Sequence, residues 1–188
     1  ILYGLKGISA YGHQARELGY YSDQVDDFYV LALEATTDDN LTVEELIRMT
    51  MRTGEMAIEV MKKLDEANTS VYGNPYPHKV NVHIKKGPLI VVSGHDLNDL
   101  EMLLEQSKGT GVNIYTHGEM LPCHGYEGLK KYPHLVGNFG GAWQDQQKQF
   151  DNLPGCILMT TNCLMRPRDS YKDRIYSTNV VGWDGVKH

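Results

Sequence analysis

The chain has 188 residues, of which 41% are hydrophobic and 22% are charged, and its formal net charge is -6. This length allows one ordinary domain or two small ones with a real hydrophobic core. The negative charge gives no electrostatic reason to expect nucleic acid or an anionic membrane as a partner, and no stretch approaches the roughly 20 apolar residues of a membrane-spanning helix. We therefore expect a cytoplasmic protein that binds neither nucleic acid nor membrane.

The first 70 residues have the apolar spacing of amphipathic helices. A second helix starts at Ser22 or Asp23, and Thr42 and Glu45 stand in capping-box register before a third helical stretch. Gly54 is a candidate break that would divide this third stretch into two helices. Amphipathic helices joined by short links predict an antiparallel helical bundle segment over residues 1–70.

Methionines recur along the third helical stretch, at Met49, Met51, Met56 and Met61. Such a stripe could suggest a cofactor site, but methionine fills helical cores readily. We expect these side chains to pack in the bundle, and we assign no chemistry to this half of the chain.

Residues 71–87 are rich in turn-forming residues and predict a linker, in which His78 and His83 are expected to be exposed. The pattern then changes to a short apolar run, "PLIVVSG", a helix capped by Asp96, and a second apolar run, "VNIYTHG". This is the outline of a parallel β-α-β unit. The runs "CILMTTN" and "DRIYSTNVVGW" predict two more strands, and "GGAWQDQQKQF" predicts a crossover helix.

The fold class expected is therefore α/β: a helical bundle segment followed by a Rossmann-like parallel α/β sheet domain over residues 88–188. The last expected strand has no covering helix after it, and an unfinished sheet edge is a liability in an independent protein. We therefore expect the domain to be incomplete and the chain to be part of a longer protein.

One potential metal ligand follows each of three expected strands: His95 after the first, Glu119 after the second and Cys163 after the third. Parallel strands end at the same edge of a sheet, where such folds bind ligands, so these side chains can converge. Taken singly, a turn histidine, a solvated glutamate and a packed cysteine are the commoner interpretations. Their shared position makes a metal centre an equal alternative to these interpretations, with iron in a mixed cluster as the better fit and zinc with an open fourth position as the other.

The other candidate residues lack this placement. Cys156 begins a strand and is expected in the core, and Cys123 is a bystander thiol near Glu119. Three cysteines are too few for a disulfide framework and are expected to be reduced thiols or metal ligands. His117 and His124 flank Glu119, either as hydrogen-bonding support for the metal ligands or as simple loop residues.

The segments "SGHDLNDLEMLLEQSKGTGVNIYTHGEMLPCHGY", "KKYPHLVGNFGGAWQDQQKQF", "MTTNCL" and "YKDRIYSTNVVGW" resemble the hybrid cluster protein family, also called hydroxylamine reductases or prismane proteins, which is related to nickel-iron carbon monoxide dehydrogenases. The resemblance is dense over residues 88–188 and more diffuse before them. It implies a hybrid iron-sulfur-oxygen cluster held by one histidine, two glutamates and four cysteines. The motifs "GHD", "HGEM" and "TTNC" match three of these ligands to His95, Glu119 and Cys163.

The same resemblance places the other four ligands beyond residue 188, and the cysteines of a second, cubane-type iron-sulfur cluster before Ile1. Cys123 stands where the family often has a small residue, which puts an extra thiol near the site. The implied function is an oxidoreductase that reduces hydroxylamine to ammonia, with nitric oxide reduction or protein nitrosylation as further proposed roles. The electron donor is not indicated. Two alternatives stay open: a non-catalytic structural fragment of that enzyme, and a mononuclear zinc enzyme.

Overall fold

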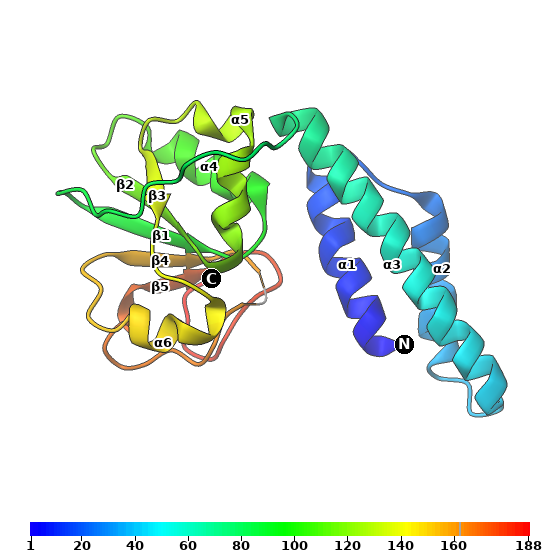
Figure 1. The fold of residues 1–188 in the computed structure, drawn as a ribbon. Helices are drawn as coiled ribbons and strands as arrows, with labels where there is room; N and C mark the ends of the chain where they lie inside the picture. Colours follow the sequence, from blue (N-terminus) through cyan, green and yellow to red (C-terminus); the bar gives the residue numbers. More distant parts are fainter. Residues whose placement is uncertain (162) are drawn as a thin grey trace. The chain divides into compact units, whose positions relative to one another are not determined.

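Helices make up the first part of the computed structural model and a parallel sheet forms the centre of the second (Figure 1). The structure describes residues 1–161 and 163–188. Contacts divide the chain into two units, Ile1–Val71 and Tyr72–His188. The α/β class predicted from the sequence, helices followed by a parallel sheet, is confirmed.

The first unit is built from three helices, α1 (Leu2–Glu17), α2 (Asp23–Ala35) and α3 (Val43–Tyr72). Apolar residues one or two turns apart on each helix meet in a shared core: Leu5, Ile8, Val25, Phe28, Ala32, Met56 and Val60. The predicted capping box is present, because Thr42 N donates to Glu45 Oε2 at 2.8 Å and Glu45 N donates to Thr42 Oγ1 at 3.3 Å. Among the residues described, no helix is both long and apolar enough to cross a membrane.

One expectation for this unit was wrong, and a second was confirmed only in part. Gly54 does not divide the third helical stretch, since α3 runs through it as one helix of 30 residues and continues into the first residues of the expected linker. A single glycine costs a long helix only about 1 kcal/mol, which its neighbours offset. The methionine stripe also splits: Met56 is buried and Met49 packs against the core, whereas Met51 and Met61 are 67% and 46% exposed.

The second unit contains a five-stranded sheet in the order β3-β2-β1-β4-β5 with every neighbouring pair parallel. Its strands are β1 (Leu89–Ser93), β2 (Asn113–His117), β3 (Leu135–Asn138), β4 (Cys156–Met159) and β5 (Ile175–Ser177). The four strands that the sequence predicted are all present, as β1, β2, β4 and β5. The edge strand β3 was not predicted.

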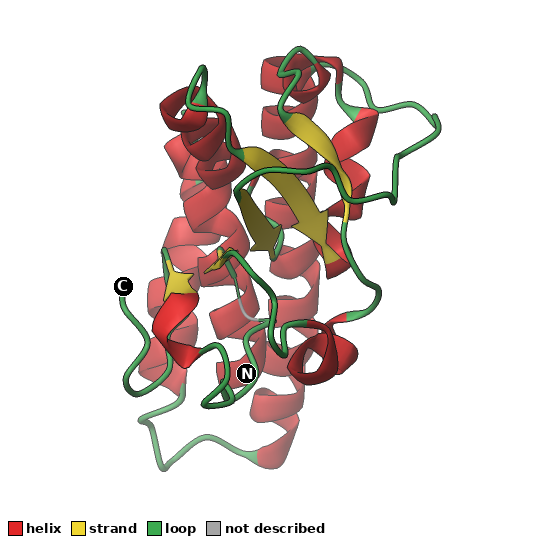
Figure 2. Ribbon diagram, turned by 90° about the vertical axis from the view of Figure 1, so that its left-hand side faces the viewer, coloured by secondary structure: helices red, strands yellow, loops and turns green. Residues whose placement is uncertain are grey.

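The connections of the sheet are mostly loops and short helices (Figure 2). They carry α4 (Leu97–Ser107), α5 (Glu127–Lys130) and α6 (Gln146–Gln149), and the 3-10 helices η1 (Gly118–Gly125), η2 (Trp143–Asp145) and η3 (Lys172–Arg174). The predicted β-α-β unit is β1-α4-β2. The crossover helix expected before β4 is present only as the short pair η2 and α6.

Residues on alternate positions of the strands face two different layers. Val91, Tyr115 and Ile157 pack in one cluster with Phe150 and Tyr171, which follow or precede the short helices α6 and η3. Helix α4 lies on the opposite face of the sheet. Met102 and Leu103 of α4 line a hollow of about 470 Å³ together with Ile90 and Leu158 of the sheet.

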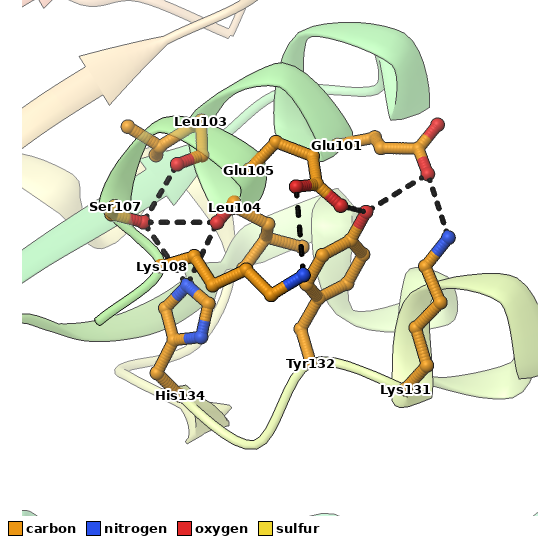
Figure 3. Close-up of polar contacts among 9 residues, drawn as sticks. All are labelled: Glu101, Leu103, Leu104, Glu105, Ser107, Lys108, Lys131, Tyr132 and His134. Atoms are coloured by element: carbon orange, nitrogen blue, oxygen red, sulfur yellow. Dashed lines mark hydrogen bonds and ion pairs between the residues drawn. The ribbon is translucent and has the colours of Figure 1, made fainter.

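Polar contacts tie α4 to the segment that leads into β3 (Figure 3). The Tyr132 hydroxyl donates to Glu105 Oε1 at 2.6 Å and lies 3.1 Å from Glu101 Oε1. His134 Nε2 lies 3.0 Å from the Leu104 carbonyl oxygen. Burial, together with hydrogen bonds to the two carboxylates, raises the pKa of Tyr132. These contacts place β3 beside β2 and complete the sheet edge.

Candidate metal centre

Two of the predicted ligands follow their strands through a glycine with positive φ. Gly94, with φ of 123°, separates β1 from His95, and Gly118, with φ of 58°, separates β2 from Glu119. A Cβ on Gly94 would lie 2.4 Å from Thr160 Oγ1, so another strand end passes very close to the backbone there. Glycine is therefore required at this turn both by conformation and by space.

The three residues predicted from the strand ends converge in the structure. His95 Nε2 lies 2.5 Å from Glu119 Oε2, and the Cys163 thiol donates to the same oxygen at 3.6 Å. One ligand atom from each side chain can be chosen so that all three lie within 4.8 Å of one another. An imidazole nitrogen, a carboxylate oxygen and a sulfur atom therefore surround one point at the carboxyl edge of the sheet.

The three side chains differ in their contact with solvent. The side chain of Glu119 is 52% exposed and that of His95 is 29% exposed, whereas Cys163 is buried. Burial, followed by the nearby Glu119 carboxylate, raises the pKa of the Cys163 thiol to about 11. At neutral pH the thiol therefore keeps its proton and shares it with Glu119. A cation at this point would favour the thiolate instead, and metal binding would release that proton.

A hydrogen bond at Nδ1 fixes the orientation of the His95 ring. Its Nδ1 lies 2.7 Å from the Thr161 hydroxyl, which leaves Nε2 facing Glu119. The next residue, Asp96, caps α4, since its Oδ1 accepts from Asn98 N at 2.9 Å and from Asp99 N at 3.0 Å. The cap is predictable from the sequence, but the contact of Thr161 is not, because nothing in the sequence shows which residue after β4 meets the imidazole.

His117 is not a loop residue. It ends β2 and is fully buried, with Nδ1 3.0 Å from the Ser93 hydroxyl and Nε2 2.7 Å from Gln149 Oε1. Its ring also packs on Phe150, with ring centroids 4.7 Å apart. Burial lowers its pKa. These interactions anchor the end of β2 to α6, and they run to the sheet and to α6 rather than to Glu119.

His124 is also buried, on η1. Its Nε2 lies 2.9 Å from the Thr116 hydroxyl, which donates in turn to Asn138 Oδ1 at 2.9 Å. Because that hydroxyl has only one proton to give, His124 is the donor in its bond with Thr116. Burial, with a smaller effect from His78, lowers the pKa of His124 to about 4. The described contacts of His124 thus support η1 and β3, and they do not reach Glu119.

The remaining candidates lie apart from the group of three. Cys123 is buried within η1, and burial raises the pKa of its thiol. Cys156 is half-buried at the start of β4, at the opposite end of that strand from Cys163. His78 and His83 are exposed, as expected. Among the described residues, His95, Glu119 and Cys163 form the group that could hold a metal ion.

A family model described as "Prismane/CO dehydrogenase family" matches residues 1–188. The chain belongs to the prismane/CO dehydrogenase family. The resemblance read from the motifs is thereby confirmed, and membership of the prismane family implies iron-sulfur cofactors. The donor set is compatible with such a cofactor, because a sulfur and a nitrogen ligand beside a carboxylate suit iron in a mixed cluster, or zinc, and do not suit calcium or magnesium.

Curated relatives of this prismane-family chain carry the name hydroxylamine reductase. Those from Caldanaerobacter subterraneus subsp. tengcongensis, Desulfitobacterium hafniense and Clostridium tetani are 55%, 53% and 53% identical to it over 188 residues. Each alignment covers 100% of this chain but only 33–34% of the relative. The chain therefore spans about a third of the length of these curated relatives.

Proposed function

We propose that this chain forms part of an iron-sulfur oxidoreductase that reduces hydroxylamine to ammonia, and that His95, Glu119 and Cys163 are three of the ligands of its hybrid iron-sulfur-oxygen cluster. The observation that carries the proposal is the meeting of these three side chains within 4.8 Å at the carboxyl edge of a parallel sheet. The name of the curated relatives and the family match support the reaction class.

When bound, the cluster supplies electrons and Lewis-acidic iron for cleavage of an N–O bond, which for hydroxylamine consumes two electrons and two protons and yields ammonia and water. The residues of this chain would hold the cluster and orient its ligand side chains. Thr161 keeps the His95 ring turned so that Nε2 is the free ligand atom. Cys163 gives up its proton on binding iron, while Glu119, about half exposed, keeps one side of the site in contact with solvent.

The finer parts of the proposal follow from the same family resemblance. The full set of one histidine, two glutamates and four cysteines would include four ligands outside this chain, and a second, cubane-type cluster would be held entirely outside it. The substrate would be a small nitrogen oxide species, hydroxylamine or nitric oxide. With three of seven ligands, the 188 residues alone are expected to show no turnover, in agreement with the alternative of a non-catalytic fragment.

The test replaces one ligand in the full-length protein encoded by the gene that contains this sequence, prepared without oxygen. Glu119→Gln keeps the size of the side chain but removes the carboxylate charge. We expect it to lose the electron paramagnetic resonance signal of the hybrid cluster and part of the iron. Glu127→Gln is the matched control, because Glu127 is exposed on α5 and pairs with Lys130.

Unchanged iron content and an unchanged spectrum in Glu119→Gln would contradict the ligand assignment. Zinc in place of iron, found by metal analysis of the oxygen-free preparation, would favour the mononuclear zinc enzyme instead. Hydroxylamine turnover by the 188-residue chain alone would show that the cluster does not need the further ligands.

A further inference from the structure

Gln146, the first residue of α6, is a polar side chain with no exposed surface. Its Nε2 donates to the Cys163 carbonyl oxygen at 2.6 Å and to the Trp143 carbonyl oxygen at 2.8 Å. Its Oε1 accepts from Met165 N at 3.0 Å. A buried amide is costly unless it is hydrogen-bonded, and both donors and the acceptor of Gln146 are used here.

These bonds act on the segment that carries a predicted ligand. Cys163 lies beyond Met159, the last residue of β4, so the ladder of the sheet does not fix its backbone. Gln146 holds this segment at two points, the carbonyl of Cys163 and the amide of Met165. The direction of the Cys163 side chain, which points its sulfur at Glu119, depends on how that backbone is held.

We propose that Gln146 is a positioning residue for Cys163: its buried amide clamps the segment after β4 so that the thiol stays beside Glu119 and His95. The role toward an iron cluster rests on the proposed function. The clamp itself belongs to the protein and can be measured on the free thiol, without any metal.

The neighbouring residue offers a matched comparison. Gln147 also donates its Nε2 to a backbone carbonyl of the same connection, that of Arg166, at 2.8 Å. Gln147, however, is only half-buried and its bond is exposed to solvent, so water can replace that bond at little cost. Two adjacent glutamines on one short helix therefore make similar bonds at different depths, and only the buried one reaches Cys163.

The experiment measures alkylation of each cysteine by iodoacetamide in the full-length protein stripped of metal by a chelator, with peptide mass spectrometry as the readout. Gln146→Met keeps the length of the side chain and removes its hydrogen bonds. We expect Cys163 to react on the order of tenfold faster, because the buried bonds that hold its backbone are lost. Cys123, buried within η1, should react at its original rate, and Gln147→Met should change neither.

A second variant tests the donors of the clamp. Gln146→Glu keeps an oxygen that can accept from Met165 N but turns a carboxylate oxygen toward the Cys163 and Trp143 carbonyls, so Cys163 should react at least as fast as in Gln146→Met. In the full-length protein prepared without oxygen, Gln146→Met should alter the resonance spectrum of the cluster, and Gln147→Met should leave it unchanged.

Equal alkylation of Cys163 in wild type and Gln146→Met would overturn the proposal. So would a parallel rise at Cys123, Cys156 and Cys163, because this would show general opening of the fold rather than release of one segment. If the full-length wild type held no iron, the proposed function would fail, yet the selective change at Cys163 would still establish the clamp.

Discussion

Thr161 places a hydroxyl 2.7 Å from Nδ1 of His95, and a hydroxyl can either donate or accept. When the proton of the neutral ring lies on Nε2, Thr161 donates to Nδ1. A metal at Nε2 would force the proton to Nδ1, and the same hydroxyl could then accept it. Thr161 can therefore hold the ring in one orientation through both states.

Replacement of Thr161 by valine should weaken metal binding without removing a ligand. Loss of a hydrogen-bond partner behind a metal-binding histidine typically lowers affinity by about 10- to 100-fold. We expect less iron per polypeptide in full-length Thr161→Val, measured against increasing chelator, and near-normal iron in Thr161→Ser, which keeps the hydroxyl. Equal iron retention by the valine and serine variants would show that the hydroxyl has no such role.

Gly94→Ala should strongly destabilise the second unit. The new Cβ would meet Thr160 Oγ1 at 2.4 Å in a backbone conformation with φ of 123°. We expect a loss of about 3 kcal/mol or more in the free energy of unfolding, from backbone strain and overpacking together. Urea unfolding followed by tryptophan fluorescence reports on this unit, since Trp143 and Trp183 both lie in it.

Gly109→Ala is the control for that measurement. Gly109 also has a positive φ, 76°, but a Cβ there meets nothing within 4 Å. Its replacement should cost only about 1–2 kcal/mol, the price of the left-handed conformation alone. Similar losses for the two variants would mean that close packing against the end of β4 does not contribute.

At the scale of elements, the stability of α4 depends on its N-cap residue, Asp96. Asp96 accepts hydrogen bonds from two backbone N–H groups of the first turn and also from Asn179 Nδ2, at 2.8 Å. Asp96→Ala removes all three and should lower the free energy of unfolding by about 2 kcal/mol. Asp145→Ala is the matched control, because Asp145 precedes α6 without a side-chain capping bond. A loss no larger than that of the control would contradict a structural role for the cap.

The strands that the sequence predicted share one property. β1, β2, β4 and β5 contain apolar residues that pack in the sheet and are bounded by glycine, proline or polar residues, which local pattern reveals. β3 is only four residues, "LVGN", and two of them disfavour strands. Its position is set by long-range contacts such as that of Tyr132 with Glu105, which no local pattern contains.

The residues of the candidate site likewise fall into those that the sequence reveals and those that only the structure reveals. His95, Glu119 and Cys163 could be found from the sequence because parallel strands bring their ends to one edge, and the glycines before His95 and Glu119 were visible beforehand as "SGH" and "HGE". Thr161 and Gln146 could not be found. Each acts across the fold, on a residue 66 or 17 positions away, and only the packed structure shows which partner it meets.

At the scale of the whole molecule, one buried histidine should make the stability depend on pH. The pKa of His124 is about 4 in the folded chain and near 6.5 when unfolded. As pH falls from 6.5 to about 4, the unfolded chain takes up a proton that the folded chain excludes, so stability present above pH 6.5 is lost. The loss should reach at most about 3 kcal/mol and level off below pH 4.

His124→Gln tests this dependence, because glutamine can donate to Thr116 Oγ1 but does not titrate. Tryptophan fluorescence in urea at pH 7.5 and pH 5 would give the free energy of unfolding for both proteins. We expect the difference between the two pH values to be smaller in the variant. Identical pH dependence would mean that His124 does not stay neutral in the folded chain. Carboxylates titrate alike in both proteins and cancel in the comparison.

The sheet order also determines when the three proposed ligands can meet during synthesis. β1 lies between β2 and β4, so β4, which leaves the ribosome long after β2, is the neighbour that brings Cys163 toward His95. Until β4 has paired, a nascent chain offers iron one nitrogen and one oxygen but no thiolate from the third strand end. The group of three side chains is therefore complete only once β4 has paired with β1.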